Sequence, residues 1–394
     1  MEFFRQYVNR PQRLWLRRFN FQLHLWAGII LSVYLIVIGA TGSILVFREE
    51  LETLTGVNPW HNVRAQEPLA DIVTVIGNMR AAHPQARIVS VFTPTQAEPI
   101  FAVSVRGRSL EPLNLAADPS TGQELGAIPR NRSWLSVVRT LHETLLVGPK
   151  GRRINGGGAV FLMLLNVTGM VIWWPGLRTW TRALLVDFAR TWRRVNFDLH
   201  RAVGFWTIAL VSFWAISGIY FGWPRETFAF VDRISPVITA KPPSVTVEPQ
   251  RGLPEPDLRQ MIAQARVLDP GTTLKGVSFP ANRRAPLLVF MQRANTVGFD
   301  YTDTLFFDPY TGQYLSTWKY GVNQSLGDWI IWSQIPLHFG TYWGLGVKII
   351  WAILGLSIPL LTVTGALMYW NRYLRKKWKH LRAPRVAAAP AAAS

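Results

Sequence analysis

Four of the seven histidines in the chain form two pairs, because the members of each pair lie in matching sequence segments. In the first pair, His24 and His200 each follow Asn-Phe-x-Leu and precede a glycine by four residues, Gly28 or Gly204. In the second pair, each histidine has a leucine before it and a glycine six residues after it: His142 and His338. The histidines without a matching partner are assigned no function: His61, His83 and His380.

Two imidazoles on opposite sides of a cofactor match the ligand set of haem iron, which takes one axial ligand on each side of the porphyrin. The chain has no cysteine, which excludes disulfides, iron–sulfur clusters and covalent c-type haem. Each glycine of the first pair shares a helical face with its histidine, so a flat ring could lie against the backbone there. We expect two non-covalent haem b groups, one held by His24 and His200 and one by His142 and His338.

Four long apolar segments predict an α-helical membrane protein with helices over residues 23–47, 157–175, 200–222 and 344–370. Charged residues make up only 16% of the chain, less than is usual in soluble proteins of this size. No cleavage site follows the first apolar segment, so we expect an uncleaved helix. Pro175 and Pro224 stand just past the second and third segments, and Pro359 predicts a kink in the fourth.

Basic residues gather on one side of the predicted helices, in residues 1–22, 176–199 and 371–394. The positive-inside rule makes this side the cytoplasm of a bacterial inner membrane, with both termini inside. The long connections over residues 48–156 and 223–343 would then be periplasmic. Much of the net charge of +19 therefore sets topology, and we expect a lipid bilayer rather than nucleic acid as the partner.

Further motifs repeat in the same order, which predicts two tandem helix-pair copies. They are Thr41-Gly42 with Ser217-Gly218, Asp118-Pro-Ser-Thr-Gly-Gln123 with Asp308-Pro-Tyr-Thr-Gly-Gln313, and Val167-Thr-Gly169 with Val363-Thr-Gly365. Two copies in the same direction imply a pseudo-two-fold axis along the membrane normal, which would place the histidines of each pair opposite each other. By depth, the Thr-Gly pairs of helices two and four fall near His24 and His200, and the Thr-Gly and Ser-Gly pairs of helices one and three fall near the other histidine pair.

Both long connections indicate small α/β units. Residues 69–82 and 255–267 show amphipathic helical spacing, and residues 100–106 and 286–292 alternate as strands do. The two Asp-Pro-x-Thr-Gly motifs predict hairpin turns, because proline and glycine set the backbone there. We assign no chemistry to these turns.

Three alternative roles for the paired histidines stay open. An intramembrane histidine is often a hydrogen-bonded core residue, and small-residue pairs often serve helix packing. A bare transition-metal site would need more ligands, and only Glu143 is close to the second pair. A proton relay would need intramembrane acids, which the predicted spans almost lack. The repetition of both pairs favours haem.

The doubled Asn-Phe-x-Leu-His-x-x-x-Gly segment, the Asp-Pro-x-Thr-Gly-Gln turns and the Leu-His segments resemble the PepSY-associated transmembrane family of bacterial proteins. The resemblance extends from Asn20 to about Tyr373. Within that family the chain looks most like the inner-membrane ferric-siderophore reductases. The resemblance implies two periplasmic PepSY-like domains and a di-haem protein with the four paired histidines as axial ligands.

The resemblance further implies an oxidoreductase that passes electrons to a periplasmic ferric siderophore and so releases Fe(II). We expect electrons from a membrane quinol or a cytoplasmic reductase to arrive at the His24/His200 haem and to leave from the His142/His338 haem. Arginines near the first pair could bind haem propionates, although topology alone accounts for basic residues there: Arg17, Arg18, Arg194 and Arg201.

Two functions without redox chemistry also stay open. A membrane-anchored binding or regulatory module would show no redox-active absorbance. A transporter of siderophore or metal would show uptake by protein that lacks haem, although four helices with few intramembrane polar groups suit alternating access poorly unless the protein dimerises.

Overall fold

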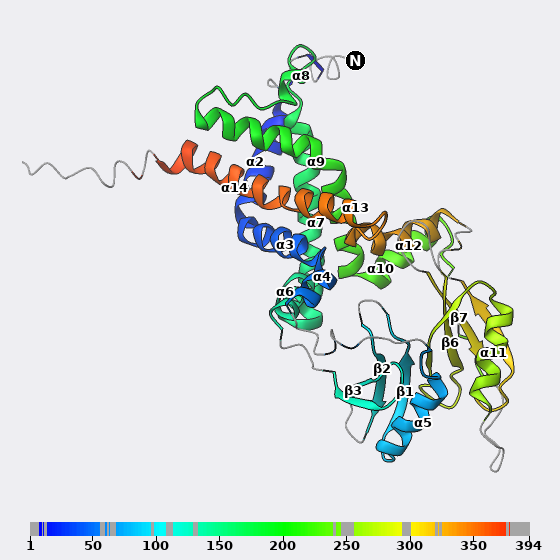
Figure 1. The fold of residues 1–394 in the computed structure, drawn as a ribbon. Coiled ribbons are helices and arrows are strands. Elements are labelled where there is room, and N and C mark those ends of the chain that lie inside the picture. Colours follow the sequence, from blue (N-terminus) through cyan, green and yellow to red (C-terminus); the bar gives the residue numbers. More distant parts are fainter. Residues whose placement is uncertain are drawn as a thin grey trace, which may run out of the picture. The chain divides into compact units, whose positions relative to one another are not determined.

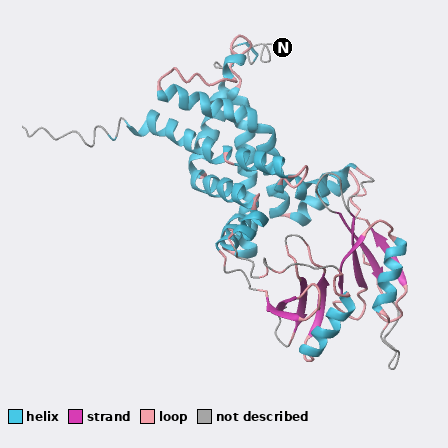
Figure 2. Cartoon of the chain, viewed as in Figure 1, coloured by secondary structure: helices cyan, strands magenta, loops and turns pink. Residues whose placement is uncertain are grey.

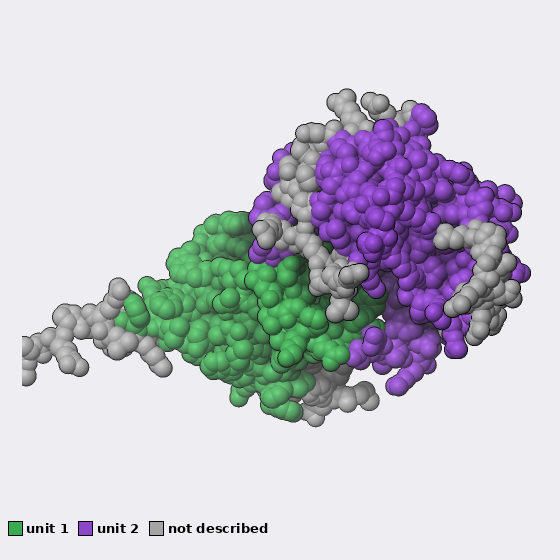
Figure 3. Space-filling model, turned by 90° about the horizontal axis from the view of Figure 1, so that it is seen from below, with its two compact units in different colours: residues 1–46, 139–224, 349–394 green, residues 47–138, 225–348 purple. Residues whose placement is uncertain are grey.

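The computed structural model describes residues 8–9, 11, 14–55, 60, 63, 68–95, 98–107, 113–128, 133–238, 242–245, 256–293, 301–319, 322, 325–375 and 378. The unpaired histidines His61 and His380, and most of the predicted basic tail, lie outside these residues. The chain forms two compact units, coloured in Figure 3. The helical unit comprises residues 1–46, 139–224 and 349–394, and the sheet unit comprises residues 47–138 and 225–348.

Figures 1 and 2 show the elements as ribbons. The helices are α2 (Trp15–Ile30), α3 (Ser32–Leu45), α4 (Arg48–Leu54), α5 (Ile72–Ala82), α6 (Trp134–Thr144), α7 (Gly148–Trp173), α8 (Trp180–Ala183), α9 (Trp192–Gly222), α10 (Pro224–Ile234), α11 (Leu258–Leu268), α12 (Leu326–Phe339), α13 (Leu345–Gly355), α14 (Ser357–Tyr369) and η2 (Trp370–Leu374). The strands are β1 (Arg87–Phe92), β2 (Phe101–Arg106), β3 (Leu113–Ala117), β4 (Glu124–Ala127), β5 (Thr273–Ser278), β6 (Leu287–Arg293), β7 (Tyr301–Phe307) and β8 (Tyr314–Trp318).

Three helices in the described part of the chain are long and apolar enough to cross a membrane: Gly148–Trp173, Trp192–Gly222 and Leu345–Leu374. The first two begin ahead of the predicted spans 157–175 and 200–222. Their opening turns carry charged residues such as Arg152 and Arg193, which hydropathy leaves out although the helix continues through them. The third is interrupted at Leu356, because Pro359 cannot donate a backbone hydrogen bond to the residue four positions back.

The first predicted span, residues 23–47, differs from a single helix. Its two parts, α2 and α3, meet at Leu31 with a bend of 67°, and they make a fourth span only if they are taken together. Gly28 and Ser32 flank the break, and glycine or serine often marks a helix kink. Beyond the bend α3 packs on α14, where a Cβ on Gly39 would lie 2.5 Å from Cδ of Pro359. Average hydropathy does not register such a bend.

The spans form a bundle in which α2 packs on α7 and α14, and α9 packs on the same two helices. In the repeat, α2 corresponds to α9 and α7 to α14. The helices that carry His24 and His200, α2 and α9, therefore lie at opposite corners of the bundle. The centre is filled by one buried aliphatic residue from each span: Leu35, Leu165, Val211 and Ile358. This arrangement determines which side chains can meet across the bundle.

The two α/β copies share one antiparallel sheet, ordered β4-β3-β2-β1-β5-β6-β7-β8. The central strands β1 and β5 occupy equivalent places in the two copies, and Val91 pairs with Val277 at the junction. One hydrophobic core runs under both halves and includes residues of α5 and α11. Arg259 of α11 also bonds Asp71, the N-cap of α5, at 2.7 Å. The Asp118 and Asp308 motifs form the predicted turns, and Gly122 and Gly312 have positive φ there.

We expect Gly276→Val to weaken the junction between the two halves of the sheet. A Cβ on Gly276 would lie 2.5 Å from the Val91 carbonyl oxygen and 2.6 Å from the Phe92 ring. The substitution should lower the free energy of unfolding by about 1–3 kcal/mol, measured as thermal unfolding of the purified chain. Gly77→Ala is the control, because a Cβ there meets no atom within 4 Å. Equal thermal stability of the two variants would contradict the prediction.

Candidate cofactor site

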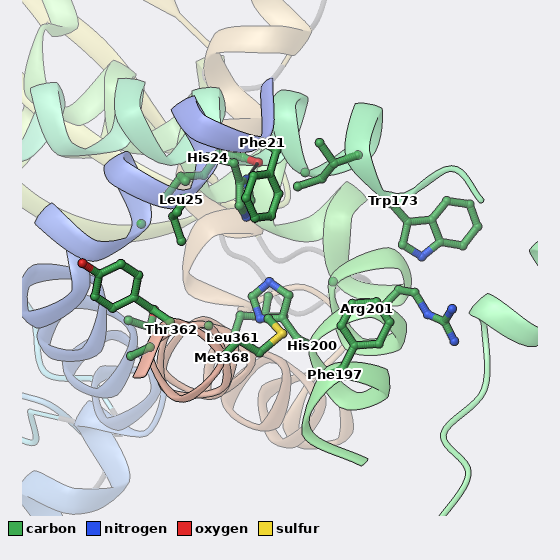
Figure 4. Close-up of a pocket in the computed structure, with 18 of the residues that line it drawn as sticks. Phe21, His24, Leu25, Trp173, Phe197, His200, Arg201, Leu361, Thr362 and Met368 are labelled. Atoms are coloured by element: carbon green, nitrogen blue, oxygen red, sulfur yellow. Dashed lines mark hydrogen bonds between the residues drawn. The ribbon is translucent and has the colours of Figure 1, made fainter. Parts of the chain in front are cut away.

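His24 and His200 face each other across the helical unit. Their ring centres lie 6.3 Å apart and the ring planes are at 89° to each other. Figure 4 shows the two rings on opposite sides of a cavity, carried by α2 and α9. Two metal–imidazole bonds of about 2 Å each, together with the ring dimensions, would separate the ring centres by roughly 6 Å. The spacing therefore fits one metal ion bound by both rings.

The cavity between the rings has a volume of about 660 Å³, within the range of small-molecule and cofactor sites. Gly28 and Gly204, the predicted ring seats, both line it. A Cβ on Gly28 would come no closer than 3.9 Å to Leu165, and one on Gly204 no closer than 3.6 Å to Leu361. Both glycines thus border the cavity without a tightly packed neighbour.

His24 is held by α7. Its Nδ1 lies 3.0 Å from the Thr168 hydroxyl and 3.1 Å from the Leu165 carbonyl. The Thr168 hydroxyl already donates its hydrogen to the Leu164 carbonyl at 2.7 Å. The next residue, Gly169, lets the ring lie close, since a Cβ there would be 3.2 Å from the His24 Cε1.

The same arrangement, which we call a threonine clasp, recurs at two more paired histidines. It consists of a threonine hydroxyl on Nδ1 and the following glycine beside Cε1. At His200 the pair is Thr364-Gly365, with Nδ1 3.0 Å from the hydroxyl. At His142 it is Thr41-Gly42, also with a 3.0 Å contact. The sequence predicted these small pairs at the right depth but not their bond to Nδ1.

The clasps determine which ring nitrogen carries the proton. Each threonine hydroxyl donates to a backbone carbonyl four residues earlier on its own helix, at 2.6 to 2.7 Å. Because that hydroxyl has no second hydrogen, it accepts from Nδ1–H of the histidine. The Leu165 carbonyl can only accept as well. Nε2 therefore keeps its lone pair, which is the form of histidine that binds a metal.

Basic side chains form part of the cavity wall. Four arginines line it: Arg17, Arg193, Arg201 and Arg372. Arg201 is held 2.9 Å from the buried carboxylate of Asp198, which Arg194 also contacts at 3.0 Å. Two of the arginines predicted near this site, Arg17 and Arg201, thus reach the cavity. Arg194 pairs with Asp198 instead, and Arg18 is not among the cavity residues.

The second predicted pair is divided between the two units. His142 belongs to the helical unit and His338, near the end of α12, to the sheet unit. The pairing of these two rings stays a prediction. Of the unpaired histidines, His83 bonds Glu124 at 2.8 Å in the sheet unit, which agrees with a structural role.

The donor set discriminates between the kinds of metal site. No group of three or more His, Cys, Asp or Glu side chains gathers in the described residues. Two imidazole nitrogens leave a bare transition-metal ion under-coordinated, since such ions take four or more ligands. They do match the two axial positions of haem iron, whose other four ligands come from the porphyrin. The residues at this site therefore fit haem.

Comparison with known proteins places the chain in a family. Residues 21–372 match the family described as PepSY-associated TM region. The chain belongs to this family. The match covers both histidine pairs and both repeats, and it confirms the family that the sequence motifs resemble. No curated protein matches the chain.

We expect Thr168→Val to weaken cofactor retention at the first site, because valine keeps the shape of threonine but cannot accept from Nδ1 of His24. Loss of such an outer contact typically costs about 10–100-fold in affinity, read here as haem loss to apomyoglobin. Thr168→Ser should retain haem. Thr362→Val is the matched control, since Thr362 lines the same cavity but bonds its own backbone at Ile358. Equal haem loss from both valine variants would refute the clasp.

Proposed function

We propose that this chain is a haem-dependent oxidoreductase of the membrane that reduces ferric iron, with a ferric siderophore as the substrate class. The observation that carries the proposal is the pair of imidazoles 6.3 Å apart, each with Nδ1 hydrogen-bonded to a threonine. Helix packing alone does not require two unprotonated Nε2 atoms beside one cavity. Binding of one haem iron by both histidines would require this arrangement.

His24 and His200 would hold one haem b, and His142 with His338 the second. When bound, haem iron supplies a one-electron couple that no side chain of the site offers. The chain orients the ligands and sets the surroundings of the cofactor. The clasps fix the histidine rings with Nε2 free to bind iron, the apolar lining excludes water, and the arginines at the cavity favour anionic groups. No side chain has to act as an acid, a base or a nucleophile.

The side of the membrane on which the substrate would be reduced follows from charge and topology. The basic segments favour a cytoplasmic location for both termini in a bacterial inner membrane, which would make the sheet unit periplasmic. Each ferric ion takes up one electron, so a membrane quinol, which yields two electrons and two protons, would serve two ferric ions. A cytoplasmic reductase is the other candidate donor. Fe(II) leaves the siderophore because hard oxygen ligands bind it less tightly than Fe(III).

The visible spectrum of the purified protein tests the proposal directly. We expect a sharp α-band after reduction with dithionite, typical of low-spin b-type haem. Adding a ferric siderophore without oxygen should abolish this band and release Fe(II), detected with a ferrous chelator. Protein that stays colourless when expressed with a haem precursor would reject the proposal. Reduced haem that ferric siderophore leaves unchanged would reject the substrate.

Single histidine replacements locate the sites. We expect His24→Ala and His200→Ala each to remove about half of the bound haem, because each leaves one of two bis-histidine sites with a single axial ligand. The pyridine haemochrome assay gives the haem content. His83→Ala is the control, since His83 bonds Glu124 in the sheet unit. Full haem content in either alanine variant of the pair would show that these residues are not ligands.

A further inference from the structure

His142 is held from two directions, and only one of these contacts belongs to the threonine clasp. Its ring is held by Thr41 of α3, at 3.0 Å. Its backbone carbonyl accepts a hydrogen bond of 2.6 Å from the side-chain amide of Asn155 on α7. The same amide lies 3.5 Å from the next carbonyl, that of Glu143. The end of α6 is therefore bonded to both neighbouring helices.

Tyr34 determines how Asn155 is oriented. The Tyr34 hydroxyl donates to Oδ1 of Asn155 at 2.6 Å and lies 3.1 Å from its backbone carbonyl. With Oδ1 occupied, the amide nitrogen of Asn155 points to α6. Gly158, one turn further along α7, leaves room for the Tyr34 ring, since a Cβ there would collide with it. Tyr34, Asn155 and His142 thus form one chain of hydrogen bonds across three helices.

The turn after His142 has a strained backbone. Leu145 and Leu146 both have positive φ, 50° and 62°, a conformation that side chains with a Cβ rarely adopt. Two consecutive strained residues tend to relax unless the neighbouring structure prevents it. The bonds from Asn155 to the carbonyls of His142 and Glu143 hold the last turn of α6 beside this strained segment.

The second repeat lacks this chain. The position matching Tyr34 is Leu210, and the position matching Asn155 is Trp351. Trp351 makes an edge contact with Trp214 instead, with ring centres 6.5 Å apart. The repeat is therefore asymmetric at this point: leucine replaces the tyrosine and tryptophan replaces the asparagine of the chain that holds His142.

We propose that Tyr34 and Asn155 are positioning residues that hold His142 in the orientation in which it would bind the second haem. The inference rests on the proposed function, because it takes His142 as a haem ligand. It assigns the two residues to the second site only. The His24/His200 site, which has its own clasps, does not depend on them.

Carbon monoxide tests the proposal, because it binds reduced haem iron only where an axial position is vacant. In the wild-type protein, with both sites closed, it should leave the reduced spectrum unchanged. In Asn155→Asp, which keeps the acceptor for Tyr34 but loses the donor to His142, about half of the haem should bind carbon monoxide. Tyr34→Phe should open a smaller fraction. The double variant should open no more than Asn155→Asp alone, since both residues act in one chain.

Two controls and a second readout complete the test. Tyr220→Phe removes a hydroxyl from α9 that makes no hydrogen bond among the described residues, and it should not admit carbon monoxide. In electron paramagnetic resonance, one low-spin signal should shift in Asn155→Asp while the other stays in place. Unchanged spectra and no carbon monoxide binding in Asn155→Asp would overturn the inference and leave the proposed function intact. Changes at both haems would also overturn it. Wild-type protein without haem would overturn both.

Discussion

A hydrogen bond from a histidine Nδ1 to a threonine hydroxyl on the neighbouring helix is the interaction on which the site depends. In a helix the threonine can give its own hydrogen to the preceding turn, as Thr168, Thr364 and Thr41 do. It can then only accept from the imidazole. One contact thereby fixes the tautomer, the ring orientation and the rotation of one helix against the next. The glycine that follows lets the two helices approach closely enough for the contact to form.

Losing such a hydrogen bond is costly inside a membrane, since a polar group in hydrocarbon finds no water to replace the lost partner. The other polar residues of the bundle follow the same rule. Asn196 donates to the Thr364 carbonyl at 2.9 Å and so links α9 to α14 beside the His200 clasp. Asn166 donates to Ser212 at 3.1 Å and links α7 to α9. Ring orientation and helix packing are therefore held by one set of bonds.

Much of this organisation could be predicted from the sequence because it is repeated. The match of His24 with His200 predicted two rings on symmetric helices, and the structure brings them together around one cavity. The bend at Leu31 was missed, because hydropathy averaged over the whole segment does not register a kink, although Gly28 and Ser32 flank the break. The union of the two α/β copies in one sheet was likewise missed. Strand pairing depends on edges that meet in space, and β1 and β5 are far apart in the chain.

The sheet also bears on how the repeat arose. Its central strands, β1 and β5, come from equivalent positions and run antiparallel, so the junction is nearly self-complementary. A single copy would leave that edge unpaired, and two identical copies could join through it as an isologous dimer. In the helical unit, His24 and His200 likewise come from equivalent positions of the two copies. Two half-length chains could form both features as a homodimer. Joining the copies in one chain allows the halves to differ, as they do at Tyr34 and Leu210.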